Sequence, residues 1–257
     1  MRRMTIACWA SVIAGAAACS QPLAPAEVTG LDDDFSGKEL SADWTVLNGD
    51  TFEHRLDGGR LHMRPTKNTV WYKKDQGPGL VKLVTGNFKV TSTVRARRAS
   101  APGEPVSNGY QFAGLIARDP ASAKPDAKES YVFNVVGYRG DYLSVETKTT
   151  KRDHSDVEGP AWPSADAELR ICRKDDVFRV YKRPIGDSFG GARSAGGEPS
   201  PPDNPWELGH TYERGDLPPT LQVGPIAYAF TDQFDLDGSF EEVRFAPVTT
   251  LEDCTTD

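Results

Sequence analysis

The sequence lacks several features that mark large classes of protein. The stretch from Thr5 to Ala18 is uncharged, but it is shorter than the roughly 20 apolar residues that a membrane-spanning helix needs. Few segments show apolar residues at the helical period, and no internal repeat is visible. Positive charge is also scarce, since 30 Lys and Arg face 37 Asp and Glu and leave a net charge of −7. An acidic chain with interspersed charges has no electrostatic footprint for nucleic acid, so we expect no nucleic-acid partner.

What the N-terminus does have is the pattern of a secretory signal peptide. A basic start, Met1-Arg2-Arg3, precedes the uncharged stretch, which closes on Ala16-Ala17-Ala18-Cys19. Small residues directly before a cysteine resemble a bacterial lipobox, in which the cysteine is acylated and becomes the new N-terminus. Ordinary cleavage after an Ala-x-Ala sequence is the alternative.

The lipobox resemblance implies a signal peptide over residues 1–18, a lipidated Cys19 and a short tether to residue 29. Ser20 is not the Asp that retains enterobacterial lipoproteins in the inner membrane, so outer-membrane residence is the expectation. Loss of Arg2 and Arg3 with the leader changes the net charge from −7 to −9.

Cysteine is rare as well, with four in the chain, and Cys8 and Cys19 belong to the leader segment. In an oxidising compartment the remaining Cys172 and Cys254 are most simply one disulfide. Two free thiols are the alternative. The bridge would close a loop of about 80 residues, a contribution of about 4.5 kcal/mol in the chain-entropy model. It would pin the C-terminal segment to an outer face of the domain.

Period-2 alternation of apolar and polar residues recurs along the mature chain and predicts β-strands. Phe88 to Arg97 is the clearest run, and Asp57-Gly58-Gly59 is a hairpin turn before the strand at Leu61. Further strands are predicted at Tyr110–Arg118, Tyr131–Tyr138, Tyr142–Thr149, Glu168–Arg173, Val177–Lys182, Leu221–Phe230 and Phe240–Phe245. About a dozen strands without a crossover helix favour stacked antiparallel sheets. We therefore predict an all-β fold, a two-sheet antiparallel β-sandwich, as a single domain over residues 30–257.

Several motifs occur in an order that points to one fold family. They are Leu31-Asp32-Asp33-Asp34-Phe35-Ser36-Gly37 before Trp44, Gly114-Leu115-Ile116-Ala117-Arg118-Asp119, Glu129 to Tyr138, Leu143 to Thr149, His154-Ser155-Asp156, the 169–173 and 178–181 hairpin, Leu217-Pro218, Leu221-Gln222-Val223-Gly224 and Phe240 to Phe245. Together they resemble the concanavalin A-like lectin/glucanase superfamily, and most closely the jelly-roll modules found alone or beside bacterial glycosidases. The resemblance implies a fold, and a fold does not by itself imply a function.

The hydrolases of that superfamily carry an E-x-D-x-x-E motif on one strand. Alternation puts its three carboxylates on one face, where the outer pair flanks a glycosidic bond. In this sequence no Glu is followed by Asp two positions later, and the adjacent Glu241 and Glu242 would point to opposite faces of a strand. The motif of a retaining glycosidase is therefore absent.

A carbohydrate-binding face remains as the leading expectation. The polar candidates on the middle strands are Arg118, Asn134, Glu146 and Lys148, with His154 just beyond. Such groups hold hydroxyl-rich ligands, and aromatic rings stack on the sugar. Trp162, in a proline-flanked loop, is the predicted platform and Trp206 a further one, whereas Trp44 and Trp71 are assigned to the core. An ordinary solvated face is the alternative.

Two other kinds of site, a lyase active site and a calcium site, have weaker patterns in the sequence. A jelly-roll lyase acting on a uronate polymer could use Tyr131, Tyr138 or His154 to move the proton and Arg118 or Lys148 to neutralise charge.

The acidic residues near the two ends of the domain could meet and hold a structural Ca²⁺, because clustered carboxylates are its preferred ligands. The candidates are Asp34, Asp235 and Asp237, next to Asp32, Asp33 and Asp232. Solvated turn residues are the alternative.

The sequence thus predicts a non-catalytic glycan-binding domain, monomeric and held in the cell envelope by a lipid anchor only. Its partner would be an oligo- or polysaccharide. A polysaccharide-degrading enzyme and a structural envelope protein without a ligand are the two rival predictions.

Overall fold

The computed structural model describes residue 28 and residues 30–185 and 205–257. The predicted signal peptide, Cys19 and most of the Pro-rich segment from Pro184 to Pro205 lie outside these residues. Within them, no helix is long and apolar enough to cross a membrane.

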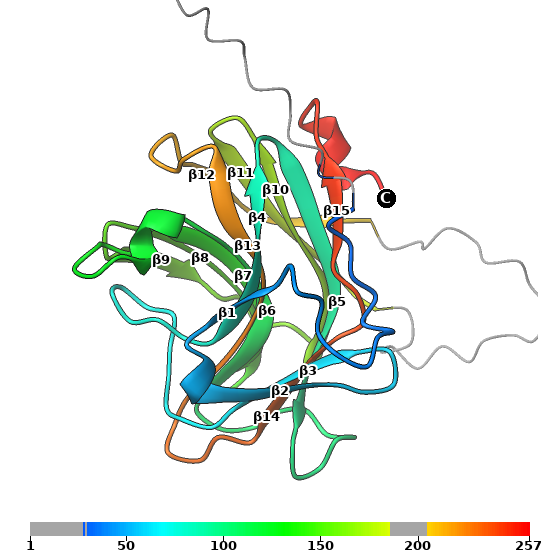
Figure 1. The fold of residues 1–257 in the computed structure, drawn as a ribbon. Coiled ribbons are helices and arrows are strands. Elements are labelled where there is room, and N and C mark those ends of the chain that lie inside the picture. Colours follow the sequence, from blue (N-terminus) through cyan, green and yellow to red (C-terminus); the bar gives the residue numbers. More distant parts are fainter. Residues whose placement is uncertain (1–27, 29, 186–204) are drawn as a thin grey trace, which may run out of the picture.

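The chain forms two antiparallel sheets that stack face to face (Figure 1). The seven-stranded sheet has the order β1 (Thr45–Leu47), β4 (Gly79–Thr85), β13 (Thr220–Phe230), β6 (Tyr110–Arg118), β7 (Tyr131–Arg139), β8 (Leu143–Lys151) and β9 (His154–Glu158). The eight-stranded sheet has the order β12 (Glu207–Glu213), β11 (Val177–Arg183), β10 (Asp166–Lys174), β5 (Phe88–Arg98), β14 (Leu236–Phe240), β3 (Leu61–Pro65) and β2 (Phe52–Leu56). In this sheet β15 (Arg244–Pro247) also pairs with β5. The prediction of a two-sheet antiparallel β-sandwich is confirmed.

Three short 3₁₀ helices complete the described residues: η1 (Gly49–Thr51), η2 (Pro120–Ala123) and η3 (Glu252–Thr255). Most predicted strands agree with the structure to within two residues. The prediction of a single strand over Phe240 to Phe245 is wrong, because β14 ends at Phe240 and β15 begins only at Arg244. Val243 pairs there with Asp33 of the N-terminal segment instead of continuing the ladder.

The strands that the alternation did not reveal are β1, β2, β4, β9 and β12. Four of these, β1, β2, β9 and β12, are edge strands, each paired with only one neighbouring strand. Edge strands are short or face solvent on both sides, so their side chains need not alternate. The fifth, β4, is mostly buried along its length, and a strand buried on both faces does not alternate either.

The main core lies between the two sheets and explains the period-2 pattern. Phe88, Val90, Val94 and Ala96 of β5 all point into it and are fully buried. Trp44 belongs to this core, as predicted. A second, smaller apolar cluster lies on the other face of the seven-stranded sheet and contains Trp71, which is also fully buried.

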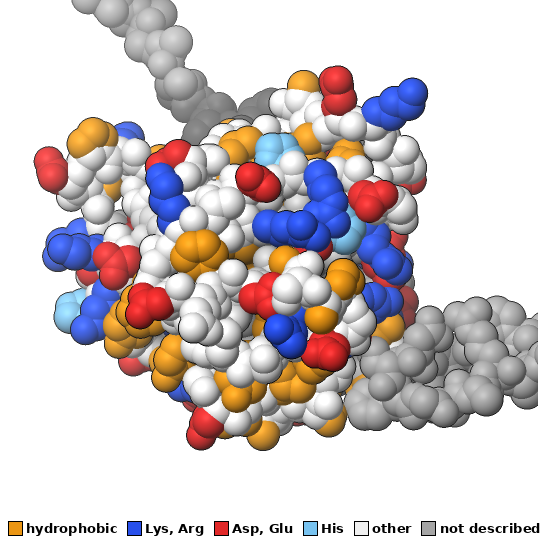
Figure 2. Space-filling view, turned by 90° about the horizontal axis from the view of Figure 1, so that it is seen from below, with side chains coloured by type: hydrophobic (Ala, Val, Ile, Leu, Met, Phe, Trp, Pro, Cys, Tyr) orange, Lys and Arg blue, Asp and Glu red, His pale blue; other side chains and the backbone are white. Residues whose placement is uncertain are grey.

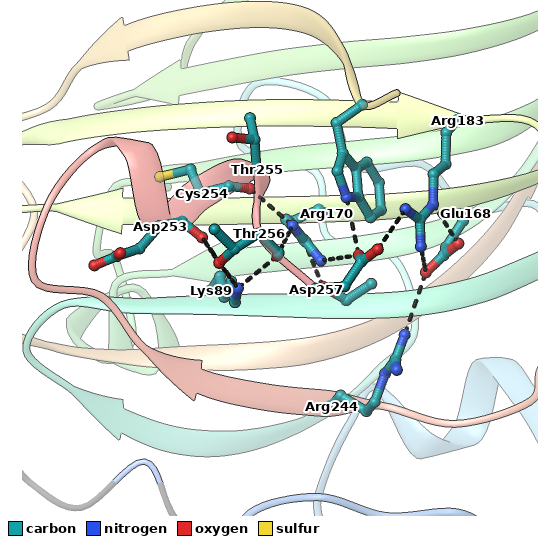
Figure 3. Close-up of polar contacts among 12 residues, drawn as sticks. Lys89, Glu168, Arg170, Arg183, Arg244, Asp253, Cys254, Thr255, Thr256 and Asp257 are labelled. Atoms are coloured by element: carbon teal, nitrogen blue, oxygen red, sulfur yellow. Dashed lines mark hydrogen bonds and ion pairs between the residues drawn. The ribbon is translucent and has the colours of Figure 1, made fainter. Parts of the chain in front are cut away.

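The predicted disulfide is present between Cys172 and Cys254, which are 82 positions apart. Alternation on β10 points Leu169 and Ile171 into the main core and Cys172 to the outside of its sheet, where η3 packs. Figure 3 shows the residues after the bridge lying across buried cations of that face. Lys89 Nζ donates to the carbonyls of Asp253 and Thr256 at 3.0 and 2.6 Å.

The charged side chains are mixed rather than segregated on the face shown in Figure 2. On the face shown in Figure 2, Lys and Arg side chains are interspersed with Asp and Glu and with apolar groups. The sequence likewise intersperses charges of both signs along the chain.

Candidate functional site

The outer face of the seven-stranded sheet, which is the face turned away from the other sheet, carries three of the predicted polar site residues, Arg118, Glu146 and Lys148. Directly paired residues of antiparallel strands point to the same face. The pairs Arg118–Tyr131, Ile116–Phe133 and Phe133–Lys148 therefore share one face. Val135 is paired with Glu146 on the same face. The apolar residues of this outer face belong to the smaller cluster and not to the main core.

The segment 66–78, which joins β3 to β4, covers part of this outer face. Trp71 is its anchor, fully buried and edge-on to the Tyr131 ring at 5.6 Å between centroids. The Lys148 ammonium donates to the Trp71 carbonyl at 2.8 Å. The backbone N–H of Thr69 donates to the Ala229 carbonyl at 2.9 Å. The segment is therefore fixed on the sheet at several points.

A pocket of about 380 Å³ opens between this segment and the sheet, and we call it the charged pocket. Its lining comes from the segment and from five strands of the sheet: Val70, Tyr72, Asp75, Tyr110, Arg139, Glu146, Lys148, Val157, Tyr228 and Phe230. The volume lies in the range of small-molecule sites, which are concave, mostly apolar and supplied with a few polar groups.

Glu146 is the centre of the charged part of the pocket. Its Oε1 is 3.3 Å from Lys148 Nζ, and its Oε2 accepts a hydrogen bond from Arg139 Nη1 at 3.3 Å. Lys148 is only 3% exposed, and its ammonium lies 4.4 Å from the centroid of the Phe133 ring. Burial lowers the pKa of Lys148, and the neighbouring Glu146 carboxylate opposes that shift. A fixed carboxylate between two cations offers both donors and an acceptor to a polar ligand.

Aromatic side chains form the rest of the wall. Tyr72, Tyr110 and Phe230 are among the exposed large hydrophobic residues of the chain. Tyr110 is directly paired with Phe230 across β6 and β13, so the two rings stand side by side at the rim. Tyr228 is buried deeper, and burial raises the pKa of its hydroxyl well above the usual range. Tyr228 therefore remains a neutral hydroxyl at physiological pH.

Of the six predicted carbohydrate-binding residues, the structure brings Glu146 and Lys148 into this pocket. Arg118 points to the same outer face but is 1% exposed. It lies beneath the segment 66–78 with its guanidinium 5.7 Å from the Trp71 ring, and its Nε and Nη2 donate to Glu129 at 2.9 and 2.7 Å. Arg118 therefore cannot contact a ligand, contrary to the expectation, and it holds the covering segment instead.

The predicted roles of Asn134 and Trp162 in sugar binding are wrong for a different reason, because both side chains face the interior of the sandwich. Asn134 is paired with Leu115, so its side chain points between the sheets, where its amide donates to the carbonyls of Tyr181 and Arg170. Trp162 belongs to the main core, and its indole N–H donates to the Asp166 carbonyl at 3.1 Å. Neither residue is available to stack on or bind a sugar, because Asn134 faces the opposite sheet and Trp162 is packed in the main core.

His154 is exposed at the start of β9 and is not part of the pocket lining. Trp206 packs beside the disulfide, with the guanidinium of Arg170 4.0 Å from its ring. Of the lyase candidates, Tyr131 is fully buried and Tyr138 packs against the main core. Only Lys148 of that set lines the pocket, so the structure does not assemble the predicted lyase site.

The predicted calcium ligands are engaged elsewhere. Asp237 accepts hydrogen bonds from Arg64, and Asp235 accepts them from Arg98 and Ser100. Asp34 accepts from the backbone N–H of Ser36 in its own turn. Among the described residues, no group of three or more His, Cys, Asp or Glu side chains is placed to hold a metal ion. The three aspartates cap turns and pair with cations instead of converging.

Sequence analysis missed most of the residues that build the pocket, notably Tyr72, Asp75, Arg139, Tyr228 and Phe230. Tyr228 and Phe230 alternate with Ala227 and Ala229 along β13, so their common face was readable from the period-2 pattern. The segment 66–78 has no periodic pattern, and nothing in its sequence indicates where it packs.

No model of a known protein family and no curated protein matches this sequence. Solved structures do resemble it. One is a functionally unknown protein from Saccharomyces cerevisiae (TM-score 0.58, 13% identity), with 81% of this chain and 98% of that chain covered. The GH43 BlXynB protein from Bacillus licheniformis has a TM-score of 0.61 at 12% identity, and the match covers 86% of this chain but 40% of that chain.

A third similar structure is the CBM2 module of the evolved Dit of Lactobacillus casei BL23 phage J-1. Its TM-score is 0.52 at 11% identity, with 83% of this chain and 93% of that chain covered. This chain therefore spans about two fifths of the GH43 protein and nearly all of the other two structures. At such low identities the likeness establishes that the chain has their β-sandwich fold, and nothing finer.

Proposed function

We propose that this protein is a non-catalytic glycan-binding sandwich of the concanavalin A-like type, held in the bacterial envelope by a lipid on Cys19. The observation that carries the proposal is the charged pocket. It combines exposed aromatic rings at its rim with a charged cluster at its base, in which Glu146 and Lys148 are buried and Arg139 is half-buried. Apolar ring faces together with a few fixed donors and acceptors are what a hydroxyl-rich ligand requires.

The chemistry of the pocket implies modest affinity. Each hydrogen bond to a sugar hydroxyl contributes about 0.5–1.5 kcal/mol net, and up to about 3 kcal/mol where a charge is involved. Few such groups line the pocket, so a dissociation constant in the micromolar range or weaker is expected. The rim residues Tyr72, Tyr110 and Phe230 supply the apolar contact that hydrogen bonds alone lack.

The similar structures support a carbohydrate-related role. Several of them are described as GH43 proteins, and one is described as a CBM2 module. The chain covers only about two fifths of the GH43 proteins, 40% and 41% of their length. Their catalytic activity is therefore not transferred to this protein.

The rival proposal is a polysaccharide-degrading enzyme, and two observations bear on it. Glu146 and Asp75 both line the pocket, and glycosidases use two carboxylates. However, both oxygens of Glu146 are already occupied by cations. For a lyase, only Lys148 of the predicted residues lines the pocket, so the proton-transferring group is missing from it. Binding without catalysis is the better account.

The test of binding is a glycan array probed with the mature domain and with two variants. Glu146→Gln and Tyr228→Phe should each weaken binding about tenfold, because each removes a polar group from the pocket wall. Glu53→Gln, at an exposed position of β2 on the other sheet, is the matched control and should bind normally. Absence of any glycan binding by the wild-type domain would favour the structural envelope protein instead.

Catalysis is tested separately on glucans, xylans and uronate polymers. The wild-type domain should release no new reducing ends and produce no near-ultraviolet absorbance from an unsaturated uronate. Either product, if lost in Glu146→Gln or Tyr228→Phe, would establish the enzyme and overturn the binding proposal.

A further inference from the structure

A second hollow adjoins the charged pocket. It has a volume of about 360 Å³, and we call it the polar hollow. Val70, Asp75 and Phe230 line both spaces, so these residues form a shared wall. The two spaces therefore adjoin one another along this wall.

We propose that the charged pocket and the polar hollow are two compartments of one site, which takes at least two linked sugar units, one in each compartment. This inference rests on the proposed glycan-binding function and adds the minimum size of the ligand. Phe230 is 52% exposed at the boundary, so its ring can contact both units as the chain passes over it.

The two compartments differ in chemistry. The charged pocket has an aromatic wall and the buried Glu146 carboxylate with its two cations. The polar hollow is lined instead by hydrogen-bonding groups of the covering segment: Asn68, Thr69, Lys74 and Gln76. These side chains supply both hydrogen-bond donors and acceptors, so a second sugar unit would find several polar partners there.

Both compartments are preformed, because hydrogen bonds to neighbouring residues hold the segment 66–78 that lines them. Gln76 Nε2 donates to Glu129 Oε1 at 2.6 Å, and Glu129 in turn accepts from Arg118. Asn48 donates to the Gly77 carbonyl at 2.7 Å. Arg118 is thus a positioning residue for the site. A site that needs no rearrangement retains the full gain from each added sugar contact.

The experiment measures affinity as a function of oligosaccharide length. An array carries one- to four-unit oligomers of xylose, glucose, mannose, galactose and galacturonate, and positives are measured by calorimetry. In the series that binds, affinity should rise about tenfold between one and two units, because the second unit adds hydrogen bonds in the polar hollow. The double variant Asn68→Ala/Lys74→Ala should abolish this rise while retaining the affinity for the single unit.

Phe230→Ala should weaken both the one-unit and the two-unit ligands, since its ring borders both compartments. Phe234→Ala is the matched control, because Phe234 is also an exposed aromatic, at 40%, but lines neither compartment. Equal affinity for one and two units, or an undiminished rise in the double variant, would overturn the two-compartment site and leave the charged pocket standing. No binding by any series would overturn the proposed function along with it.

Discussion

Asp237 on β14 is the carboxylate at which side chains of the β2–β3 hairpin converge. Its Oδ2 accepts from Arg64 at 2.6 and 3.0 Å, and its Oδ1 lies 2.9 Å from His62 Nδ1. Burial alone would raise the pKa of Asp237, but the hydrogen bonds from His62 and Arg64 outweigh burial and hold it at about 2. A pKa below the 3.8 of a free side chain stabilises the fold above that pH, and the contribution is lost as the pH falls through about 2.

Asp237→Asn should therefore lower the free energy of unfolding by about 2 kcal/mol at neutral pH. The difference from wild type should shrink as the pH falls from about 4 to about 2, because the wild-type carboxylate is then protonated as well. Urea unfolding at three pH values measures this, and Asp141→Asn at an exposed turn position is the control. A deficit that is unchanged at the lowest pH would refute the ionic origin.

The C-terminal segment 248–257 is an element without strand pairing of its own that depends on the disulfide and on buried cations. Arg170 is 2% exposed and donates to the carbonyls of Cys254 and Thr256 at 2.8 and 2.7 Å (Figure 3).

Replacing both Cys172 and Cys254 by alanine should cost about 2–5 kcal/mol of stability. Amide exchange over 248–257 should accelerate most, while β6 stays protected. Exchange that is unchanged in this segment would mean that the cations hold it without the bridge.

At the scale of the whole molecule, the prediction concerns attachment to the membrane. Cys19 lies outside the described residues, and the expectation rests on the small residues that precede it. Cys19→Ala should abolish labelling with a fatty-acid analogue and release the protein from the membrane fraction, because the proposed acyl chains would be its only anchor. Cys8→Ala, within the leader, is the control and should remain labelled. Membrane association that persists without Cys19 would exclude a lipid anchor at this residue.

The local pattern of the sequence determined the architecture of this protein. Alternation along Phe88–Arg97 separates inward from outward side chains without reference to any distant residue. It placed Glu146 and Lys148 together, because they are two positions apart on one strand. The pairing of Cys172 with Cys254 followed from their number and from the outward direction of Cys172.

Only the tertiary structure decided which outward-facing positions are open. Arg118 and Lys148 share one face, but the segment 66–78 covers Arg118 completely and leaves Lys148 at the base of a pocket. Asn134 has the opposite direction to both, and a period of two does not state which side meets the second sheet. The physical reason is range: alternation is set by each residue's own backbone, whereas coverage depends on where a non-periodic segment from elsewhere in the chain packs.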